Sequence, residues 1–115
     1  MTHYLNLHHE PFELSAQGLK TIELRLLDEK RKKISVGDRV VFADSQAPSA
    51  VIECRVIALH LFDSFDELYA ALPLDKCGYL PHELKTASPK DMEAYYSPEK
   101  QRQYGVVGIE LEIVR

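Results

Sequence analysis

The sequence predicts a single α+β domain over residues 1–115, a small mixed β-barrel of about five or six strands with short helices between them. The length of 115 residues is enough for one hydrophobic core but not for two. An apolar fraction of 45% and a charged fraction of 28% are ordinary for a globular protein. The short strand-like segments do not alternate regularly with helices, which favours a closed or partly closed barrel over a doubly wound sheet.

The N-terminal part of the chain predicts two strands on either side of a short helix. Tyr4 to Leu7 is the first expected strand. Pro11 to Gln17 follows as a helix, with proline in its first turn and Gly18 just past its end. Lys20 to Leu26 is then expected as the second strand.

The middle of the chain predicts two further strands. Val36-Gly37-Asp38 is a turn signal before a strand from Arg39 to Ala43. Ser45 to Ser49 is expected to break the chain, and Ala50 to Phe62 is expected as the longest strand. Its alternation predicts one buried face, formed by Ile52, Cys54, Val56 and Ala58.

Serine residues mark the expected starts of the later helical segments. Ser64 to Glu67 matches a capping box, and Ser88 to Asp91 opens a second helix in the same way. Ser97-Pro98 begins a further short turn, and Val106 to Val114 is the last strand. Its inward side chains are expected to be Val107, Ile109, Leu111 and Ile113.

Several function classes are disfavoured by composition. No apolar run approaches the roughly 20 residues of a membrane helix, and the N-terminus does not resemble a signal peptide. Cys54 and Cys77 show no pairing pattern, as expected in a reducing compartment. We therefore expect a cytoplasmic protein without a membrane partner, which folds as a monomer or a small homo-oligomer.

The distribution of charge indicates where an anionic ligand would bind. A net charge of -4 disfavours a protein that grips long nucleic acid through its phosphates. Residues 1–60 carry eight basic and eight acidic side chains, whereas residues 61–115 carry six and ten. An anion is therefore expected on the first half, which contains Lys20, Arg25, Lys30, Arg31, Lys32, Lys33 and Arg39.

The most informative motif is Gly18-x-Lys20-x-x-Glu23-x-Arg25, which places three charges in a run that otherwise resembles a buried strand. Strand alternation puts Glu23 and Arg25 on one face. Lys20 belongs to the other face by parity, but it follows Gly18 closely, so the aim of its side chain stays open. The three charges form either a ligand site or a structural ion network that closes the barrel.

The motif and its flanks resemble the ASCH family of the PUA-like β-barrel superfamily, over nearly the whole chain. The flanks are the helix carrying Pro11 and Phe12, the turn Val36-Gly37-Asp38, and Tyr104-Gly105 before the last strand. This resemblance implies a PUA-like barrel with a cleft where the helix and the motif strand meet. It implies RNA, a nucleotide or a modified nucleoside as the partner.

The resemblance also implies an alternative, a hydrolase that acts on a modified nucleoside amide or on RNA phosphodiesters. A subset of similar proteins hydrolyses N4-acetylcytidine with a lysine at the position of Lys20 and a threonine nucleophile at that of Glu23. Glu23 departs from this pattern, because a carboxylate cannot serve as a threonine-type nucleophile. An enzyme would instead use Lys20 and Glu23 as a catalytic acid and base pair, in an amidohydrolase or a ribonuclease. A protein-interaction module is the third alternative.

The run Tyr95-Tyr96-Ser97, together with Tyr79 and Tyr104, offers further candidate ligand contacts, of which Tyr96, Ser97 and Tyr104 are assigned to the site. An aromatic ring can stack on a base and a hydroxyl can donate to it, although an aromatic core and a helix cap explain the same residues. No metal or other cofactor is expected, because the side chains of His8-His9 diverge and no third ligand recurs at regular spacing. The run of four basic residues at 30–33 is more typical of a solvated loop than of a phosphate site.

Together these observations predict a cleft lined by Lys20, Glu23 and Arg25. Lys20 and Arg25 would engage a phosphate or a base carbonyl, and Glu23 would accept from an exocyclic amine. A tyrosine would stack on the base.

Overall fold

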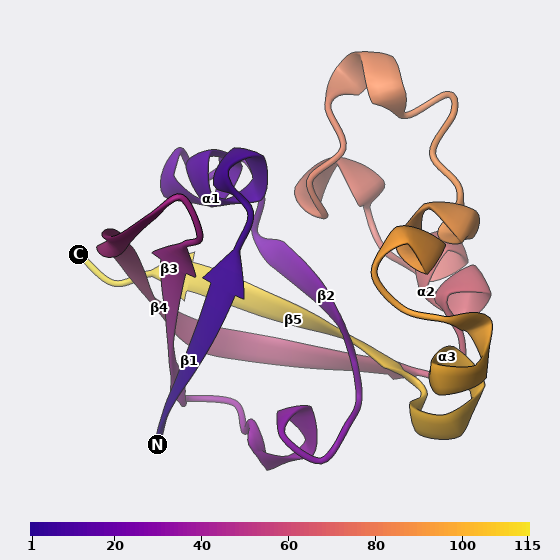
Figure 1. Ribbon diagram of the computed structural model, residues 1–115, viewed down its shortest axis with the longest axis horizontal. Helices are drawn as coiled ribbons and strands as arrows, with labels where there is room; N and C mark the ends of the chain where they lie inside the picture. The colour runs from indigo at the N-terminus through magenta and orange to yellow at the C-terminus, as the bar shows by residue number, and fades with distance from the viewer.

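A curved sheet of five strands organises the molecule, as shown by a computed structural model that describes residues 1–115 (Figure 1). The strands lie in the order β1-β3-β4-β5-β2. β1 (Thr2–Leu7) runs parallel to β3 (Arg39–Asp44). β4 (Ala47–Phe62), β5 (Val106–Ile113) and β2 (Ile22–Leu26) each run antiparallel to their neighbours. The sheet forms a mixed half-barrel, which confirms the predicted α+β fold class.

Side chains, rather than a backbone ladder, bridge the two edge strands of this half-barrel. The guanidinium of Arg25 on β2 donates to the carbonyl of Asn6 on β1 at 2.8 Å. Lys30, beyond the end of β2, donates to the carbonyl of Tyr4 at 3.3 Å. The charged motif was expected to form either a ligand site or a network that closes the barrel. Its Arg25 contributes to closure by bridging β2 and β1.

Three α-helices and four short 3-10 turns connect the strands. The helices are α1 (His9–Ala16), α2 (Phe65–Ala71) and α3 (Pro98–Tyr104). The 3-10 turns are η1 (Arg31–Lys33), η2 (Leu74–Lys76), η3 (Pro81–Glu83) and η4 (Pro89–Ala94). Ser64 is confirmed as the N-cap of α2, since its hydroxyl accepts from the Glu67 amide at 3.2 Å. The Glu67 carboxylate accepts from the Asp63 amide rather than from that of Ser64, so the predicted capping box is only half formed. The helix expected after Ser88 is instead a 3-10 turn.

Two hydrophobic clusters pack on opposite faces of the sheet. The first fills the half-barrel and contains Phe12 of α1 with side chains of β1, β3, β4 and β5. The second packs α2 and η4 against β2, through Ile22, Leu24 and Leu26. Because these three side chains alternate along β2, Glu23 and Arg25 project from its other face. The inward positions predicted for β5 are confirmed, with Val107, Ile109, Leu111 and Ile113 all in the first cluster or against it.

Three sequence-based expectations about strands were wrong. The second strand begins at Ile22 rather than Lys20, and the chain expected to break at Ser45 to Ser49 re-enters the sheet at Ala47. The pairing of β4 with β5 shifts register between Val56 and Ala58. This bulge reverses the alternation, so Leu59 rather than Ala58 packs against the core.

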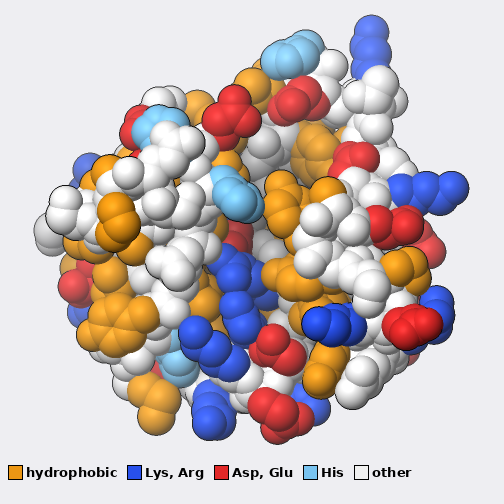
Figure 2. All heavy atoms as spheres, viewed as in Figure 1, with side chains coloured by type: hydrophobic (Ala, Val, Ile, Leu, Met, Phe, Trp, Pro, Cys, Tyr) orange, Lys and Arg blue, Asp and Glu red, His pale blue; other side chains and the backbone are white.

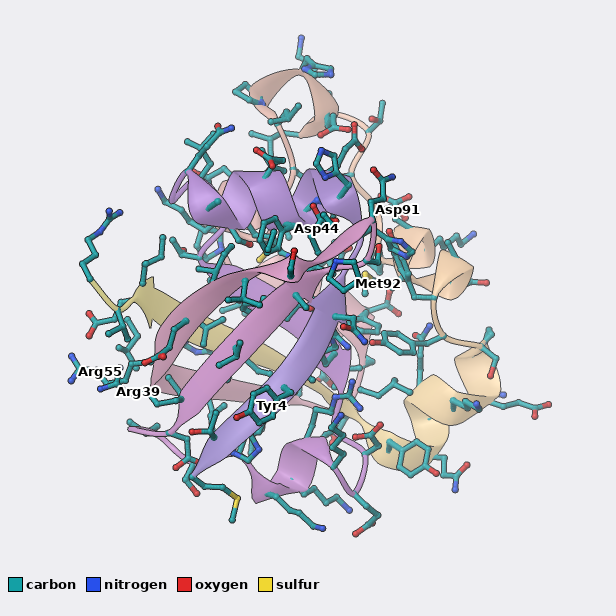
Figure 3. All side chains as sticks on the ribbon, turned by 60° about the vertical axis from the view of Figure 1, so that its left-hand side comes forward. Tyr4, Arg39, Asp44, Arg55, Asp91 and Met92 are labelled. Carbon is teal, nitrogen blue, oxygen red and sulfur yellow. The ribbon has the colours of Figure 1, made fainter.

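Arg39 and Arg55, which pair across β3 and β4, both extend away from the sheet at its solvent face (Figure 3). The same view places Asp44 where β3 ends beneath α1. None of the helices has the length and apolar character required to cross a membrane. Oligomeric state and cytoplasmic location stay predictions.

Candidate functional site

A cavity of about 860 Å³ lies where α1, β2 and the segment from Tyr69 to Tyr96 meet. In Figure 1 that segment, coloured pink to orange, faces α1 across β2. Figure 2 shows a hollow in the same region with Lys and Arg side chains at its base. Lys20, Glu23 and Arg25 all line this cavity, so the structure brings the three charged residues of the motif together.

The chain is still turning where Lys20 leaves it. Gly18 ends α1 at a φ of 77°, a conformation that favours glycine. The Lys20 amide donates to the carbonyl of Leu14 at 3.2 Å, and the Thr21 amide donates to the backbone carbonyl of Lys76 at 2.9 Å. Lys20 thus precedes β2 and escapes its alternation. Its side chain reaches the face of Glu23, which answers the question that strand parity left open.

Glu23 lies between two cations. One carboxylate oxygen accepts from Nζ of Lys20, and the other accepts from Nε of Arg25 at 2.7 Å. The three side chains are only 10%, 6% and 14% exposed in the order Lys20, Glu23, Arg25. The group carries one net positive charge in a mostly buried position, where an anion or a carbonyl oxygen is attracted strongly.

Two opposing effects act on the pKa of Glu23. Burial by itself raises it, but the charges and hydrogen bonds of Lys20 and Arg25 lower it further than burial raises it. The net result is a pKa below the ordinary value, so Glu23 is ionised at neutral pH. A general base works best with a pKa near the working pH, and Glu23 is therefore poorly suited to that role.

Both cations keep unused hydrogen-bond donors. An ammonium has three donors, and Lys20 uses one of them on Glu23. A guanidinium has five donors, of which Arg25 uses one on Glu23 and one on Asn6. The cavity floor can therefore donate to a ligand without breaking the network around Glu23.

Gly78 packs directly over the stem of Lys20. Its φ is 109°, and a Cβ built there would lie 3.3 Å from Cδ of Lys20. The absence of a side chain at Gly78 leaves Lys20 room to extend toward Glu23. This glycine is a site residue that sequence reasoning missed, because its partner lies far away in the chain.

A chain of hydroxyl groups forms another part of the wall. The phenols of Tyr69 and Tyr79 are hydrogen-bonded at 2.7 Å, and Tyr79 donates to Asp91 at 2.7 Å. Burial, together with these hydrogen bonds, raises the pKa of Tyr79 well above its ordinary value. Both phenols are neutral, so they can hydrogen-bond to a polar ligand without adding charge.

The other predicted contacts separate into two groups. Tyr96 lines the cavity, and burial raises the pKa of its phenol despite the opposing charge of Arg25. Ser97 and Tyr104 do not line it. Ser97 caps α3 by accepting from the Lys100 amide at 3.3 Å, and Tyr104 packs against the second hydrophobic cluster.

An accessible aromatic pair at the cavity joins Tyr95, which the sequence offered for stacking, to His8, which was not expected as a ligand contact. The ring of Tyr96 stacks on Phe65 with centroids 6.3 Å apart and planes 14° apart, so one of its faces is occupied. Tyr95 is exposed, and its ring centroid lies 6.1 Å from that of His8 on the α1 side. Tyr95 and His8 both line the cavity. Tyr95 is therefore the more accessible stacking surface.

A smaller cavity of about 310 Å³ also touches Lys20 and Glu23. It is lined by core side chains such as Phe42 and Leu111, and Arg25 does not contribute to it. The larger cavity combines all three charges with several aromatic rings. It is the better candidate for ligand binding.

Comparisons with known proteins agree with this architecture. A family model described as the ASCH domain matches residues 5–115. The crystal structure of the hypothetical protein PH0355 is similar with a TM-score of 0.81 and 30% identity, over 99% of this chain and 100% of that one. The solution structure of PF0455 from Pyrococcus furiosus is similar with a TM-score of 0.73 and 32% identity, over 100% and 99%.

A more distant structure shares the fold. A mutant of ZmASCH from Zymomonas mobilis has a TM-score of 0.67 at 12% identity, over 96% of this chain and 67% of that one. A search of curated proteins found no match.

Proposed function

Because this chain belongs to the ASCH domain family, we propose that its larger cavity binds a nucleotide, a modified nucleoside or a short single-stranded RNA. The family suggests nucleic acid as the partner. One observation carries the proposal, namely two mostly buried cations with unused donors on the floor of a cavity with aromatic walls. That combination suits a ligand with a negative or carbonyl oxygen and a flat base.

Each polar group of the ligand has a proposed partner. Lys20 and Arg25 donate to a phosphate or a base carbonyl, and Glu23 accepts from an exocyclic amine through a lone pair not used by the cations. The base stacks on Tyr95 or the open side of Tyr96. The direct contacts of Ser97 and Tyr104 that the sequence suggested are not part of this proposal.

The size and charge of the cavity limit the ligand. A volume of about 860 Å³ is in the range of sites for small molecules, which is roughly 300–1,000 Å³. Glu83 and Asp91 line it on the side of the Tyr69–Tyr96 segment. These carboxylates disfavour a long phosphate backbone, so a mononucleotide or a single strand that inserts one nucleotide is preferred.

A hydrolase stays the alternative, and the chemistry of the site weakens it. Glu23 is held ionised by two cations, and the nearby Cys77 thiol is buried with a pKa raised to about 11. A base poised near neutral pH and an activated nucleophile are what such a reaction needs.

The experiment is a thermal-shift and calorimetric panel of nucleosides, 5′-mononucleotides, N4-acetylcytidine and short oligoribonucleotides, with mass spectrometry of every mixture. We expect binding by at least one panel member, weakened at least about 10-fold by Lys20→Ala through loss of a charged hydrogen bond. Lys33→Ala is the matched control, because Lys33 is an exposed cation outside the cavity.

Four results would decide against the proposal. If no panel member binds, or if Lys20→Ala binds every ligand as tightly as wild type, the cavity is not the site. If a bound ligand is converted to product, the hydrolase alternative replaces simple binding. A protein partner retained by Lys20→Ala would instead favour the interaction module.

A further inference from the structure

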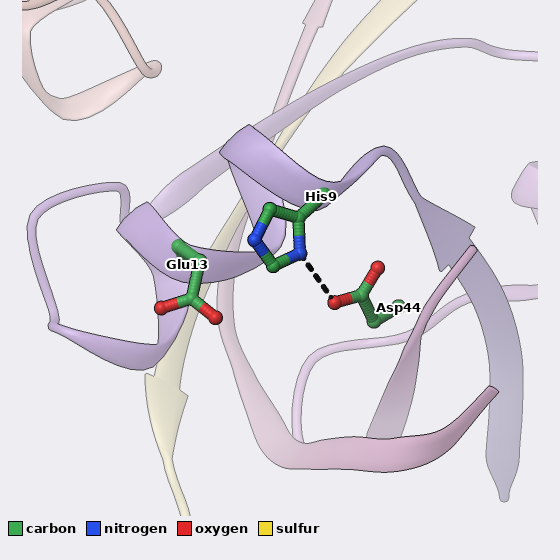
Figure 4. Close-up of side chains that lie close together, drawn as sticks. All are labelled: His9, Glu13 and Asp44. Carbon is green, nitrogen blue, oxygen red and sulfur yellow. Dashed lines mark hydrogen bonds and ion pairs between the residues drawn. The ribbon is translucent and has the colours of Figure 1, made fainter. Parts of the chain in front are cut away.

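Three side chains with metal-binding atoms meet at the start of α1, apart from the charged motif. They are His9, Glu13 and Asp44, and their ligand atoms all lie within 4.8 Å of one another (Figure 4). In Figure 4 the His9 ring lies between the two carboxylates. They are the one group of this kind in the structure.

The helix and the sheet each contribute to the group. His9 and Glu13 are four residues apart on α1, so they share a face of the helix. Asp44 is the last residue of β3, and the parallel pairing of β1 with β3 brings it beneath α1. The sequence predicted no metal site because it offered His8 with His9, whereas the fold supplies Asp44 from 35 positions away.

Asp44 is held in place as a metal ligand requires. It is only 3% exposed, and one of its oxygens accepts from the Gln46 amide at 2.9 Å. The other oxygen lies 2.7 Å from Nδ1 of His9. In metal sites, a ligating carboxylate is typically oriented by a hydrogen bond from a neighbouring group that does not itself bind the metal, as the Gln46 amide does here.

We propose that His9, Glu13 and Asp44 bind a divalent transition-metal ion of the zinc class. One imidazole and two carboxylates suit zinc, and three protein ligands leave a fourth position for water. Bonds of about 2.0–2.2 Å imply ligand atoms roughly 3.3 Å apart in a tetrahedron. The His9–Asp44 contact must then open by about half an ångström, and the exposed Glu13 must close in.

The ion would sit at the margin of the larger cavity, because His9 and Gln46 line it. This inference goes beyond the proposed function and does not depend on it. Its residues differ from Lys20, Glu23 and Arg25, so the two proposals can fail separately.

The test is calorimetric titration of the full chain with Zn²⁺ in the absence of any nucleotide. We expect one ion per chain, and a loss of affinity of at least about 10-fold in His9→Ala and in Glu13→Gln. Glu13 is exposed, so Glu13→Gln reports on metal binding even if a change at the buried Asp44 unfolds the protein. His60→Ala is the matched control, because His60 pairs with Glu110 at 2.8 Å without a third ligand.

Two results would overturn the inference. Absence of Zn²⁺ binding at concentrations on the order of 1 mM would mean that the His9–Asp44 pair only fastens α1 to β3. Equal affinity in wild type, His9→Ala and Glu13→Gln would place the bound ion elsewhere. Circular dichroism of each variant confirms that the compared proteins are folded.

Discussion

Replacing Glu23 by glutamine should destabilise the protein far more than the loss of one hydrogen bond would. The change leaves the ammonium of Lys20 and the guanidinium of Arg25 close together without the anion that separates them. Removing one partner of a buried charge pair costs roughly 3–5 kcal/mol. Because the two cations are 10% and 14% exposed and border a cavity, we expect the lower end, about 3 kcal/mol.

This loss is measurable as a change in melting temperature. A domain of this size loses about 4 °C per kcal/mol, so Glu23→Gln should melt about 12 °C below wild type at pH 7. Glu112→Gln is the matched control, since Glu112 accepts from Arg55 in a pair of which both members are about half exposed. We expect that control to melt within about 2 °C of wild type.

The pH dependence gives the reasoning a second check. The ordinary pKa of this carboxyl is 4.5, and folding lowers it below that value. The folded protein therefore binds this proton less tightly than the unfolded chain does. The stabilisation by Glu23 is therefore complete above the unfolded pKa and is lost as the pH falls below 4.5. The gap between wild type and Glu23→Gln should narrow between pH 5 and pH 3.

Two outcomes would refute this account of the network. Equal melting temperatures for Glu23→Gln and Glu112→Gln would show that Glu23 does not hold the two cations. A gap that stays constant or widens in acid would show that the carboxylate is not held ionised.

Two further predictions follow from burial and backbone geometry. Burial raises the pKa of Cys54 and Cys77 from 9.0 to about 11 each. Ellman's reagent should therefore react roughly 100-fold more slowly with the native protein than with the protein in urea. Rapid labelling of both thiols in the native protein would contradict this prediction. Gly78→Ala should lower the melting temperature more than Gly37→Ala. Both glycines have positive φ, but only a Cβ at position 78 presses on Lys20, so equal losses in thermal melts would show that this contact is unimportant.

Local patterns explain what could be predicted from the sequence. Alternation correctly separated Glu23 and Arg25 from the apolar face of β2, because side-chain direction in a strand depends only on neighbouring residues. The Ser64 cap was predictable for the same reason. The bulge before Ala58 inserts an extra residue, so the side chains beyond it exchange faces and the predicted alternation fails there.

The rest of the site depends on contacts between distant segments. The aim of Lys20 depends on Thr21 bonding to Lys76 and on the space left by Gly78. No local pattern records either contact. The same holds for Asp44 beside His9, which the parallel pairing of β1 with β3 brings together.

The pairing of β2 with β5 also sets when the cavity can exist. Glu23 lies opposite Ile109, which is 86 positions further along the chain. At roughly 5–20 residues per second, β2 leaves the ribosome about 4–17 s before its partner strand is made. During that interval the motif has no neighbouring strand to hold it in register, since such long-range pairing forms late in folding. The proposed ligand would therefore meet only the finished domain and not the early nascent chain.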